Sequence, residues 1–508
     1  MIETDTEAVA TTEAPPSGES NFHRMTSERF SALGLWGLSE IFRDERAPAS
    51  YWSGDAERVL AVVHTGPERW DVYVSLLLRD AVGRYRPARH SGPFPTVRSA
   101  ENAISGPLGH SALAASFEHE TAGPPEGVDL FTPLVPDARM APEFRYLRDS
   151  FAQSGARELL RVLQPWVIDL DGNLVKDFQS TGYSARVWEI YLRFAFAEMN
   201  LTIANNHDVP DFELVRGDRR VFVEATTVNP RRGEPGAGLR PGAPPSWPED
   251  LMRHLEQEMP LRFGSPLHTK MQKLYWDQAH VKGNPFILAI ADFHSPVSMT
   301  WSHTALPIYL YGRSAELVTG PDGKPTGVEK LLPGFERKSE TLKPFFEQDG
   351  TENVSAILSS NAGTIAKFNR MGIRAGFGDK YVTLRRSGIR HVPGPDAFEP
   401  LPFDEDVEAA ASLENWSDEL AMFHNPNAEV PLDPEMFPGI AHYHLIQGEA
   451  VWFGPPGRVL ASQTITMDPL NRDKHMWPQR PSDDMSSEED ETPPAATVPP
   501  QSSLDIPL

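Results

Sequence analysis

Two acidic residues on neighbouring predicted strands are the strongest candidates for chemistry in this sequence. Asp211 follows Pro210 at the start of one predicted strand, and Glu224 lies on the next strand along the chain. Because side chains alternate across a strand, Glu224 shares a face with Phe222 and Thr226, so a carboxylate stands within an otherwise apolar strand. Burying such a charge is unfavourable unless a partner compensates it. Magnesium is a suitable partner, because it takes one or two carboxylates and completes its octahedron with water and phosphate oxygens.

Three further charged residues lie on the predicted helices that flank these strands. Glu189 lies on the helix before them, and Lys270 and Lys273 lie on the helix after them. On a helix over 267–278, a step of roughly 100° per residue places Lys270 about 90° from the centre of the buried stripe, where a long side chain can reach a site. Lys273 faces solvent. Lys270 is therefore better placed than Lys273 to reach a site, and Glu189 flanks the buried stripe of its own helix in the same manner.

The elements that carry these residues follow one another in a defined order. The apolar patterns predict a helix, a short strand, a hairpin that turns at Gly217, further helices and a buried strand, at 184–200, 201–206, 211–228, 249–279 and 284–293.

In this order the residues resemble the PD-(D/E)XK superfamily of restriction-endonuclease-like phosphodiesterases, whose core is a helix, three strands, a helix and a strand. Pro210 and Asp211 match the PD element, and Glu224 to Thr226 match the (D/E)XK element. Glu189 matches an acid often found on the first helix. Thr226 stands where the family has lysine, but in that superfamily the following helix can supply the lysine. The body of the chain is also similar to a bacterial family that contains this core, which implies no activity.

The resemblance implies a nuclease that uses Mg²⁺ or Mn²⁺ to hydrolyse phosphodiester bonds of DNA or RNA, with Asp211 and Glu224 as metal ligands. It also implies that Lys270 is the catalytic lysine and that Glu189 assists through the metal or the attacking water. Arg231, Arg232 and Lys273 are expected to contact nucleic-acid phosphates, although solvated side chains explain the two loop arginines equally well. The alternative is a catalytically inactive core that serves as a scaffold for a protein or nucleic-acid partner.

The predicted strands and helices make the protein mixed α/β (α+β), and the resemblance implies a restriction-endonuclease-like core between its other parts. The 508 residues are enough for about three domains. We expect a disordered acidic tail, a small α+β unit, a linker with helices, the nuclease-like core, a C-terminal α/β region and a second disordered acidic tail, at 1–24, 25–125, 126–180, 181–312, 313–470 and 471–508.

Several classes of protein are excluded by composition. The chain has no cysteine, so disulfides, thiolate zinc sites and a cysteine nucleophile are absent. A net charge of −24 argues against coating nucleic acid through global charge, and leaves a local basic groove open. No apolar run is long enough for a membrane span, so we expect a soluble, cytoplasmic protein. The oligomeric state is not predicted.

Two other groups of residues have simpler interpretations than ligand binding. The glycine-rich segment 359–380 lacks the spacing of a phosphate-binding loop, and Asn361 as a helix N-cap with Gly372 at the helix end explains most of it. Phosphate contacts from Lys367 and Arg370 are the alternative. The histidines are expected to be structural rather than zinc ligands, the candidates being His294, His303 and His424. The sequence at 169–173 predicts a tight hairpin turn.

Overall fold

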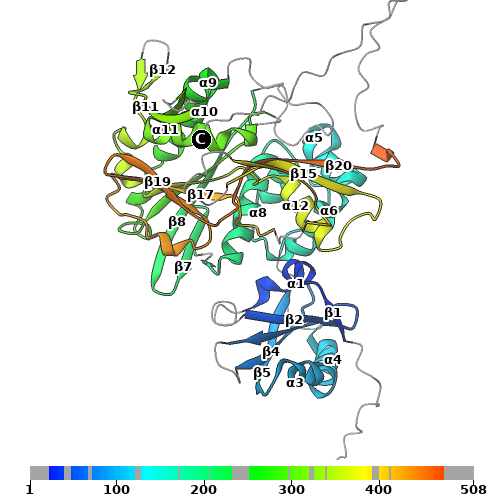
Figure 1. Ribbon diagram of the computed structural model, residues 1–508. Helices are drawn as coiled ribbons and strands as arrows, with labels where there is room; N and C mark the ends of the chain where they lie inside the picture. Colours follow the sequence, from blue (N-terminus) through cyan, green and yellow to red (C-terminus); the bar gives the residue numbers. More distant parts are fainter. Residues whose placement is uncertain are drawn as a thin grey trace, which may run out of the picture. The chain divides into compact units, whose positions relative to one another are not determined.

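The computed structural model describes residues 22–38, 47–66, 71–119, 127–169, 172–204, 206–231, 251–295, 298–319, 325–337, 340–391, 400–410 and 414–473. The protein is mixed α/β and divides into two compact units, one of residues 1–30 and 37–125 and one of residues 31–36 and 126–508 (Figure 1). Among the described residues, no helix has both the length and the hydropathy needed to cross a membrane.

The first unit contains a five-stranded antiparallel sheet in the order β1-β2-β3-β4-β5. The apolar face of β3 and β4 packs against α3 and α4 in one core cluster. A capping box between Thr96 and Ser99 starts α3. The elements are β1 (His23–Met25), α1 (Ser27–Leu33), β2 (Ala47–Gly54), β3 (Val59–Thr65), β4 (Val72–Arg79), β5 (Tyr85–Phe94), α3 (Val97–Ile104) and α4 (Pro107–His119).

The second unit is built on an eight-stranded sheet in the order β19-β18-β17-β14-β9-β8-β7-β6. At its centre β8, β9 and β14 run parallel, and β6, β7 and β8 form an antiparallel meander at one edge. The strands are β6 (Thr202–Ala204), β7 (Phe212–Arg216), β8 (Arg219–Val228), β9 (Phe286–Asp292), β14 (Ala356–Ser360), β17 (Leu420–His424), β18 (Ala441–Ile446) and β19 (Glu449–Phe453).

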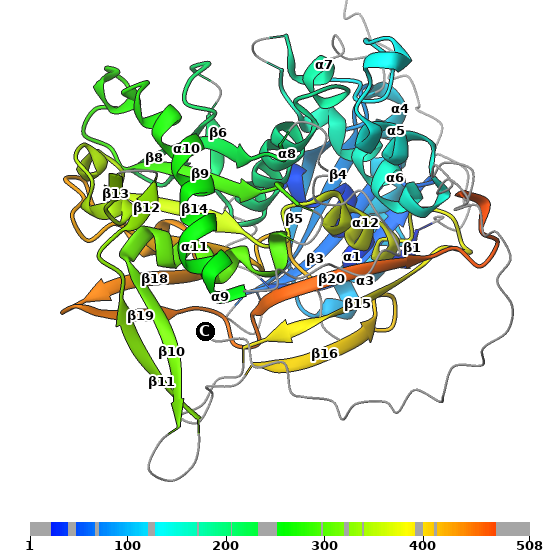
Figure 2. The same cartoon turned by 90° about the horizontal axis from the view of Figure 1, so that it is seen from above.

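Helices cover both faces of this sheet (Figure 2). On one face Phe196 of α8 (Tyr183–Glu198) contacts Phe212 of β7 edge to face. On the other face Phe222 and Leu288 join a core cluster with Leu267 of α10. That face is covered by α9 (Leu251–Arg253), the π-helical η5 (His254–Glu258), α10 (Met259–Met271) and α11 (Ser302–Tyr311). The alternation along β8 therefore sends successive side chains towards different helices.

Smaller elements complete the second unit. A three-stranded sheet has the order β16-β15-β20, and two ribbons pair β10 with β11 and β12 with β13. The bounds are α5 (Pro142–Asp149), α6 (Ser154–Leu163), α7 (Leu174–Phe178), β10 (Arg313–Thr319), β11 (Pro325–Leu331), β12 (Phe335–Arg337), β13 (Glu340–Leu342), α12 (Ile365–Arg374), β15 (Thr383–Arg390), β16 (Leu401–Asp406) and β20 (Val459–Met467).

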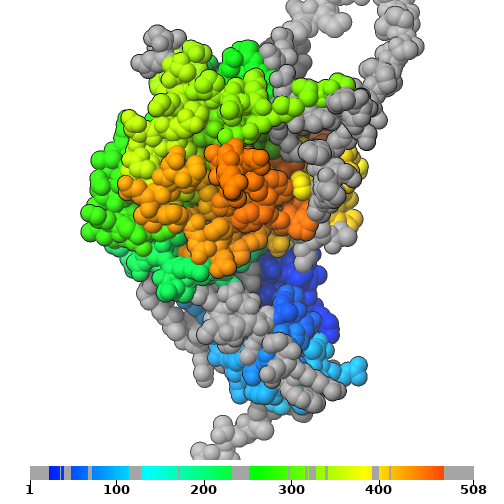
Figure 3. Space-filling model, turned by 60° about the vertical axis from the view of Figure 1, so that its left-hand side comes forward, coloured from blue at the N-terminus to red at the C-terminus, as the bar shows by residue number. Residues whose placement is uncertain are grey.

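One expectation about organisation differs from the structure. The segment 356–453 adds β14, β17, β18 and β19 to the sheet that contains β9, so no boundary falls near residue 312. Figure 3 shows the later part of this segment (orange) against the green part of the chain. The Tyr311 hydroxyl donates a hydrogen bond to the His424 carbonyl. The hairpin turn expected at 169–173 includes residues 170 and 171, which lie outside the described residues; the Asp169 carboxylate accepts a hydrogen bond from the amide of Leu174, where α7 begins.

The helix predicted within 359–380 exists, but its ends differ from those expected. The N-cap of α12 is Thr364 rather than Asn361. Gly372 lies inside the helix, where a Cβ atom would stand 2.2 Å from the carbonyl oxygen of Gly155 on α6. Gly372 is therefore needed for the close approach of two helices and not for a helix end.

Candidate active site

The carboxylate of Glu224 lies at the centre of a group of polar side chains on β8. Only 2% of this residue is exposed. Its Oε1 atom accepts hydrogen bonds from the ammonium group of Lys270, at 2.5 Å, and from the hydroxyl of Tyr275. Its Oε2 atom accepts a hydrogen bond from the backbone amide of Asp211 at 3.3 Å. Both oxygens of this buried carboxylate are therefore bound by donors, as its burial requires.

Asp211 and Glu224 are connected by hydrogen bonds between the side chain of each residue and the backbone of the other strand segment. It precedes β7 directly and follows a cis Val209-Pro210 bond. Its Oδ2 atom accepts a hydrogen bond from the Ala225 amide at 2.7 Å. Burial raises the pKa of Asp211 well above its usual range, and the negative charge of Glu224 raises it further. The two strands thus hold a pair of neighbouring carboxylates that repel one another.

The two candidate lysines lie in different surroundings. Lys270 is in the last turn of α10, which ends at Met271, so the helix expected to continue to residue 278 does not. The ammonium group of Lys270 reaches Glu224 from this helix end. Lys273 lies beyond the helix and is exposed, with its ammonium 5.7 Å from the centre of the Tyr275 ring.

Tyr275 is a site residue that the sequence did not single out. Leu274 takes a left-handed conformation, with φ of 49°, and begins the short helix η6 (Tyr275–Asp277). This conformation is a true outlier for a bulky side chain. The resulting turn brings the Tyr275 hydroxyl to Glu224. Burial and the charge of Glu224 both raise the pKa of Tyr275, which keeps its hydroxyl protonated as a donor. No sequence signal marks this turn, since it lacks glycine and keeps helical apolar spacing.

Glu189 faces the same group of charges from α8, but its hydrogen bond is to another residue. Its Oε2 atom lies 2.6 Å from Arg186, which also pairs with Asp177 at 2.9 Å. Burial raises the pKa of Glu189, while the charges of Arg186 and Lys270 oppose this effect. Glu189 is therefore within electrostatic range of Lys270 without bonding to it.

Two stacked imidazoles support the turn that leads into Asp211. The rings of His207 and His280 lie 3.7 Å apart and nearly parallel. The Nε2 atom of His280 is 3.0 Å from the Val209 carbonyl, and His207 lies 3.2 Å from buried Glu213. This pair links the segment before Asp211 to the segment after Tyr275, and no motif in the sequence marks it.

Only one of the two predicted loop arginines belongs to the described residues. Arg231 is exposed at the end of the described segment that contains β8, and Arg232 lies outside the described residues. Thr226 is half-buried on β8, two residues after Glu224. The structure thus brings together Asp211, Glu224 and Lys270 of the predicted set, with Glu189 close by.

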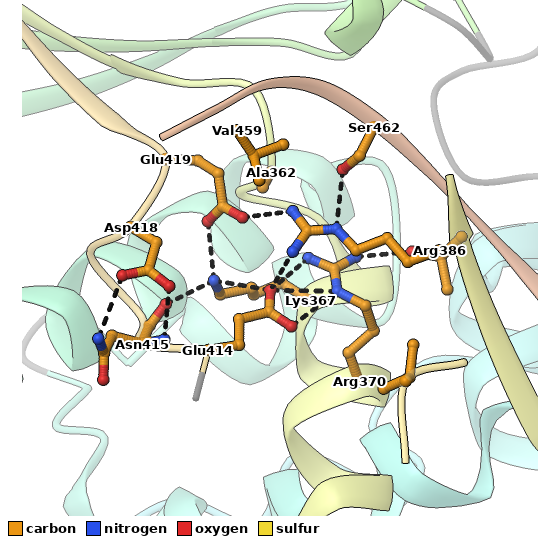
Figure 4. A network of polar contacts seen from close by, with 12 residues as sticks. Ala362, Lys367, Arg370, Arg386, Glu414, Asn415, Asp418, Glu419, Val459 and Ser462 are labelled. Atoms are coloured by element: carbon orange, nitrogen blue, oxygen red, sulfur yellow. Dashed lines mark hydrogen bonds and ion pairs between the residues drawn. The ribbon is translucent and has the colours of Figure 1, made fainter. Parts of the chain in front are cut away.

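Lys367 and Arg370 are buried and do not present a phosphate-binding surface (Figure 4). Lys367 pairs with Glu414 and Glu419, each at 2.8 Å, and Arg370 pairs with Glu414 at 2.7 Å. Arg386 of β15 contacts both glutamates. Although burial alone would raise the pKa of Glu414, the three cations hold it well below its usual range. Phosphate contacts by these residues are therefore not supported.

The three histidines considered for zinc lie apart from one another in separate surroundings. His294 bonds to Asp292 at 2.6 Å, and His424 bonds to His442 at 2.9 Å. Burial lowers the pKa of His303 to about 4. In the part of the chain that the structure describes, no three or more acidic or histidine side chains are arranged to hold a metal ion.

Comparison with protein-family models, with curated proteins and with solved structures gives no match.

Proposed function

We propose that this protein is a nuclease that hydrolyses nucleic-acid phosphodiester bonds with the help of Mg²⁺ or Mn²⁺. The observation that carries the proposal is the meeting of Asp211, Glu224 and Lys270, from two strands and the helix that follows them. The element order α8, β6, β7, β8, α10, β9 supports a restriction-endonuclease-like core around them.

The two carboxylates suit a hard divalent cation. Their mutual repulsion, together with burial, raises the pKa of Asp211, and a cation between them would relieve that repulsion. Because no larger ligand cluster exists among the described residues, Asp211 and Glu224 would be the protein's ligands, and water and substrate phosphate would fill the other positions. When bound, the metal supplies polarisation of a phosphoryl oxygen and a water of lowered pKa.

The other residues would act by position and charge. Lys270 would stabilise the negative charge that develops on the phosphate and orient the attacking water. Lys270 is bonded to Glu224 in the structure. A bound cation would therefore share the Glu224 carboxylate with Lys270 or displace Lys270 from it. Tyr275 would hold Glu224 in one orientation, as outer partners of metal ligands do. Glu189 would assist through the water, while Arg186 holds its carboxylate in place.

The test is a cleavage assay on single- and double-stranded DNA and RNA with Mg²⁺, Mn²⁺ or EDTA. We expect metal-dependent cleavage of at least one substrate, its loss in Lys270→Ala, and retention of most of it in the matched Lys273→Ala control. Thr226→Lys should partly restore activity to Lys270→Ala, because it returns a lysine beside Glu224. Full activity in folded Lys270→Ala protein would contradict the assigned role. Binding of nucleic acid without cleavage under any of these conditions would favour an inactive scaffold.

A further inference from the structure

Arg193 lies beside the candidate active site and belongs to none of its ion pairs. It is on α8, one turn after Glu189, so both side chains project from the same side of that helix. Its guanidinium carbon is 5.7 Å from the centre of the Phe212 ring, and Phe212 directly follows Asp211. Arg193 therefore lies beside the first residue of β7, on the face of the sheet that α8 covers.

The guanidinium of Arg193 lacks a hydrogen-bonding counter-ion. Within the described residues its contacts are the Phe212 ring and a longer-range attraction to Glu189. Glu189 is already bonded to Arg186, and Arg186 also pairs with Asp177. Burial lowers the pKa of Arg193 to about 10, so the group still carries its charge at neutral pH. A half-buried cation without an anion is unfavourable, and a bound anion would compensate it.

We propose that Arg193 binds a phosphate group of the nucleic-acid strand. The planar guanidinium matches phosphate oxygens in a two-pronged hydrogen bond, and its contact with an aromatic ring fixes its plane. Lys270 reaches Glu224 from α10, whereas Arg193 lies on α8 beside Phe212, the residue after Asp211, so Arg193 would contact a different phosphate of the strand from the one at Lys270. This inference rests on the proposed nuclease function and adds a substrate-binding residue to it.

The experiment measures binding without cleavage. Fluorescent single- and double-stranded DNA and RNA are titrated with Glu224→Gln protein in EDTA at several salt concentrations. Adding Arg193→Met should weaken the binding of at least one ligand about tenfold and reduce the slope of log affinity against log salt by roughly 0.7–0.9, the loss of one phosphate contact. The matched control is Arg385→Met, which removes an equal charge from an exposed pair with Asp404 and should change neither quantity.

Thermal melting separates this role from a structural one. If Arg193 is an anion-binding residue, Arg193→Met should leave the melting temperature of the free protein unchanged or raise it, because an uncompensated charge is removed. Inorganic phosphate should raise the melting temperature of the wild-type protein more than that of Arg193→Met. Arg193→Gln provides a second test if the methionine variant does not fold.

The outcomes distinguish this inference from the proposed function. Unchanged affinity and salt slope in folded Arg193→Met or Arg193→Gln would overturn the role of Arg193 while leaving the nuclease proposal standing. Absence of binding to all four nucleic acids by the Glu224→Gln protein, together with absence of cleavage by the wild type, would overturn the nuclease proposal itself. Stabilisation by inorganic phosphate without nucleic-acid binding would assign the site to a free anion and overturn the inference.

Discussion

At the scale of single residues, Asp211 and Glu224 show that buried acidic side chains can be recognised from the sequence. An acid within an apolar strand can be predicted from the alternation of side chains and the penalty for burying charge. In the structure Glu224 has three donors, and the Oδ2 atom of Asp211 has one, the Ala225 amide. Burial and the charge of Glu224 therefore disfavour the ionised form of Asp211, whose pKa is raised.

We expect Asp211→Asn to stabilise the metal-free protein and to abolish cleavage. Because the folded-state pKa of Asp211 is raised, the folded protein holds a proton that the unfolded chain releases. The stability that this proton provides is present at low pH and is lost as the pH rises through the raised pKa. Asparagine cannot ionise, so the gain in free energy of unfolding should grow with pH.

Melting curves in EDTA from about pH 5 to pH 9 measure this difference. Asp208→Asn is the control, since Asp208 is exposed three residues earlier and should give no gain. A melting temperature of Asp211→Asn below that of the wild type across the range would show that the ionised carboxylate stabilises the fold through Ala225.

At the scale of elements, strands were easier to predict than the end of a helix. The hairpin of β7 and β8 turns at Gly217, where φ of 61° suits glycine, and the buried strand β9 reads as a continuous apolar run. The end of α10 has no such marker, because Leu267, Met271 and Tyr275 keep helical spacing past the point where the helix stops. The left-handed Leu274 depends on tertiary contacts, among them the bond of Tyr275 to Glu224.

The turn after α10 leads to a prediction about metal affinity. Tyr275→Phe removes one of the donors that orient Glu224 and leaves Lys270 in place. We expect the Mg²⁺ concentration for half-maximal cleavage to rise about 10–100-fold, as for other outer partners of metal ligands. The free energy of unfolding should fall by only about 1 kcal/mol.

Tyr183→Phe is a matched control for this change. The Tyr183 hydroxyl is buried and has no hydrogen-bond partner in the described part of the chain, so its removal should leave the Mg²⁺ requirement unchanged. If the Mg²⁺ concentration for half-maximal cleavage is also unchanged in Tyr275→Phe, then Lys270 and the strand backbone alone position Glu224.

At the scale of the whole molecule, the second unit joins segments that are distant in sequence. β9 and β14 pair in parallel with 63 residues between them, and β17 and β18 extend the sheet further. Local patterns predict the individual strands, but they do not predict which strands pair across such distances, which is why the region after residue 312 was expected to be separate. A buried ion network accompanies this assembly: it joins α12, β15 and the segment 414–419 (Figure 4).

We expect this network to stabilise the second unit strongly once it is formed. Lys367 is fully buried and pairs with two carboxylates, and their charges remain in the interior if the lysine is removed. Breaking a buried pair costs up to about 3–5 kcal/mol. Because Arg370 and Arg386 still pair with the two carboxylates, Lys367→Met should lower the free energy of unfolding by less than that full amount. Urea unfolding measures it.

The matched change is Arg385→Met, which removes the same charge from a half-exposed pair with Asp404 and should cost much less, because solvent screens an exposed pair. The second carboxylate can be tested in the same series. Adding Glu419→Gln to Lys367→Met should recover part of the loss, because it neutralises one of the two charges left behind and keeps a side chain that can accept from Arg386. Equal, small costs for Lys367→Met and Arg385→Met would mean that water or nearby groups compensate the carboxylates without the lysine. The network would then contribute little to holding the distant segments together.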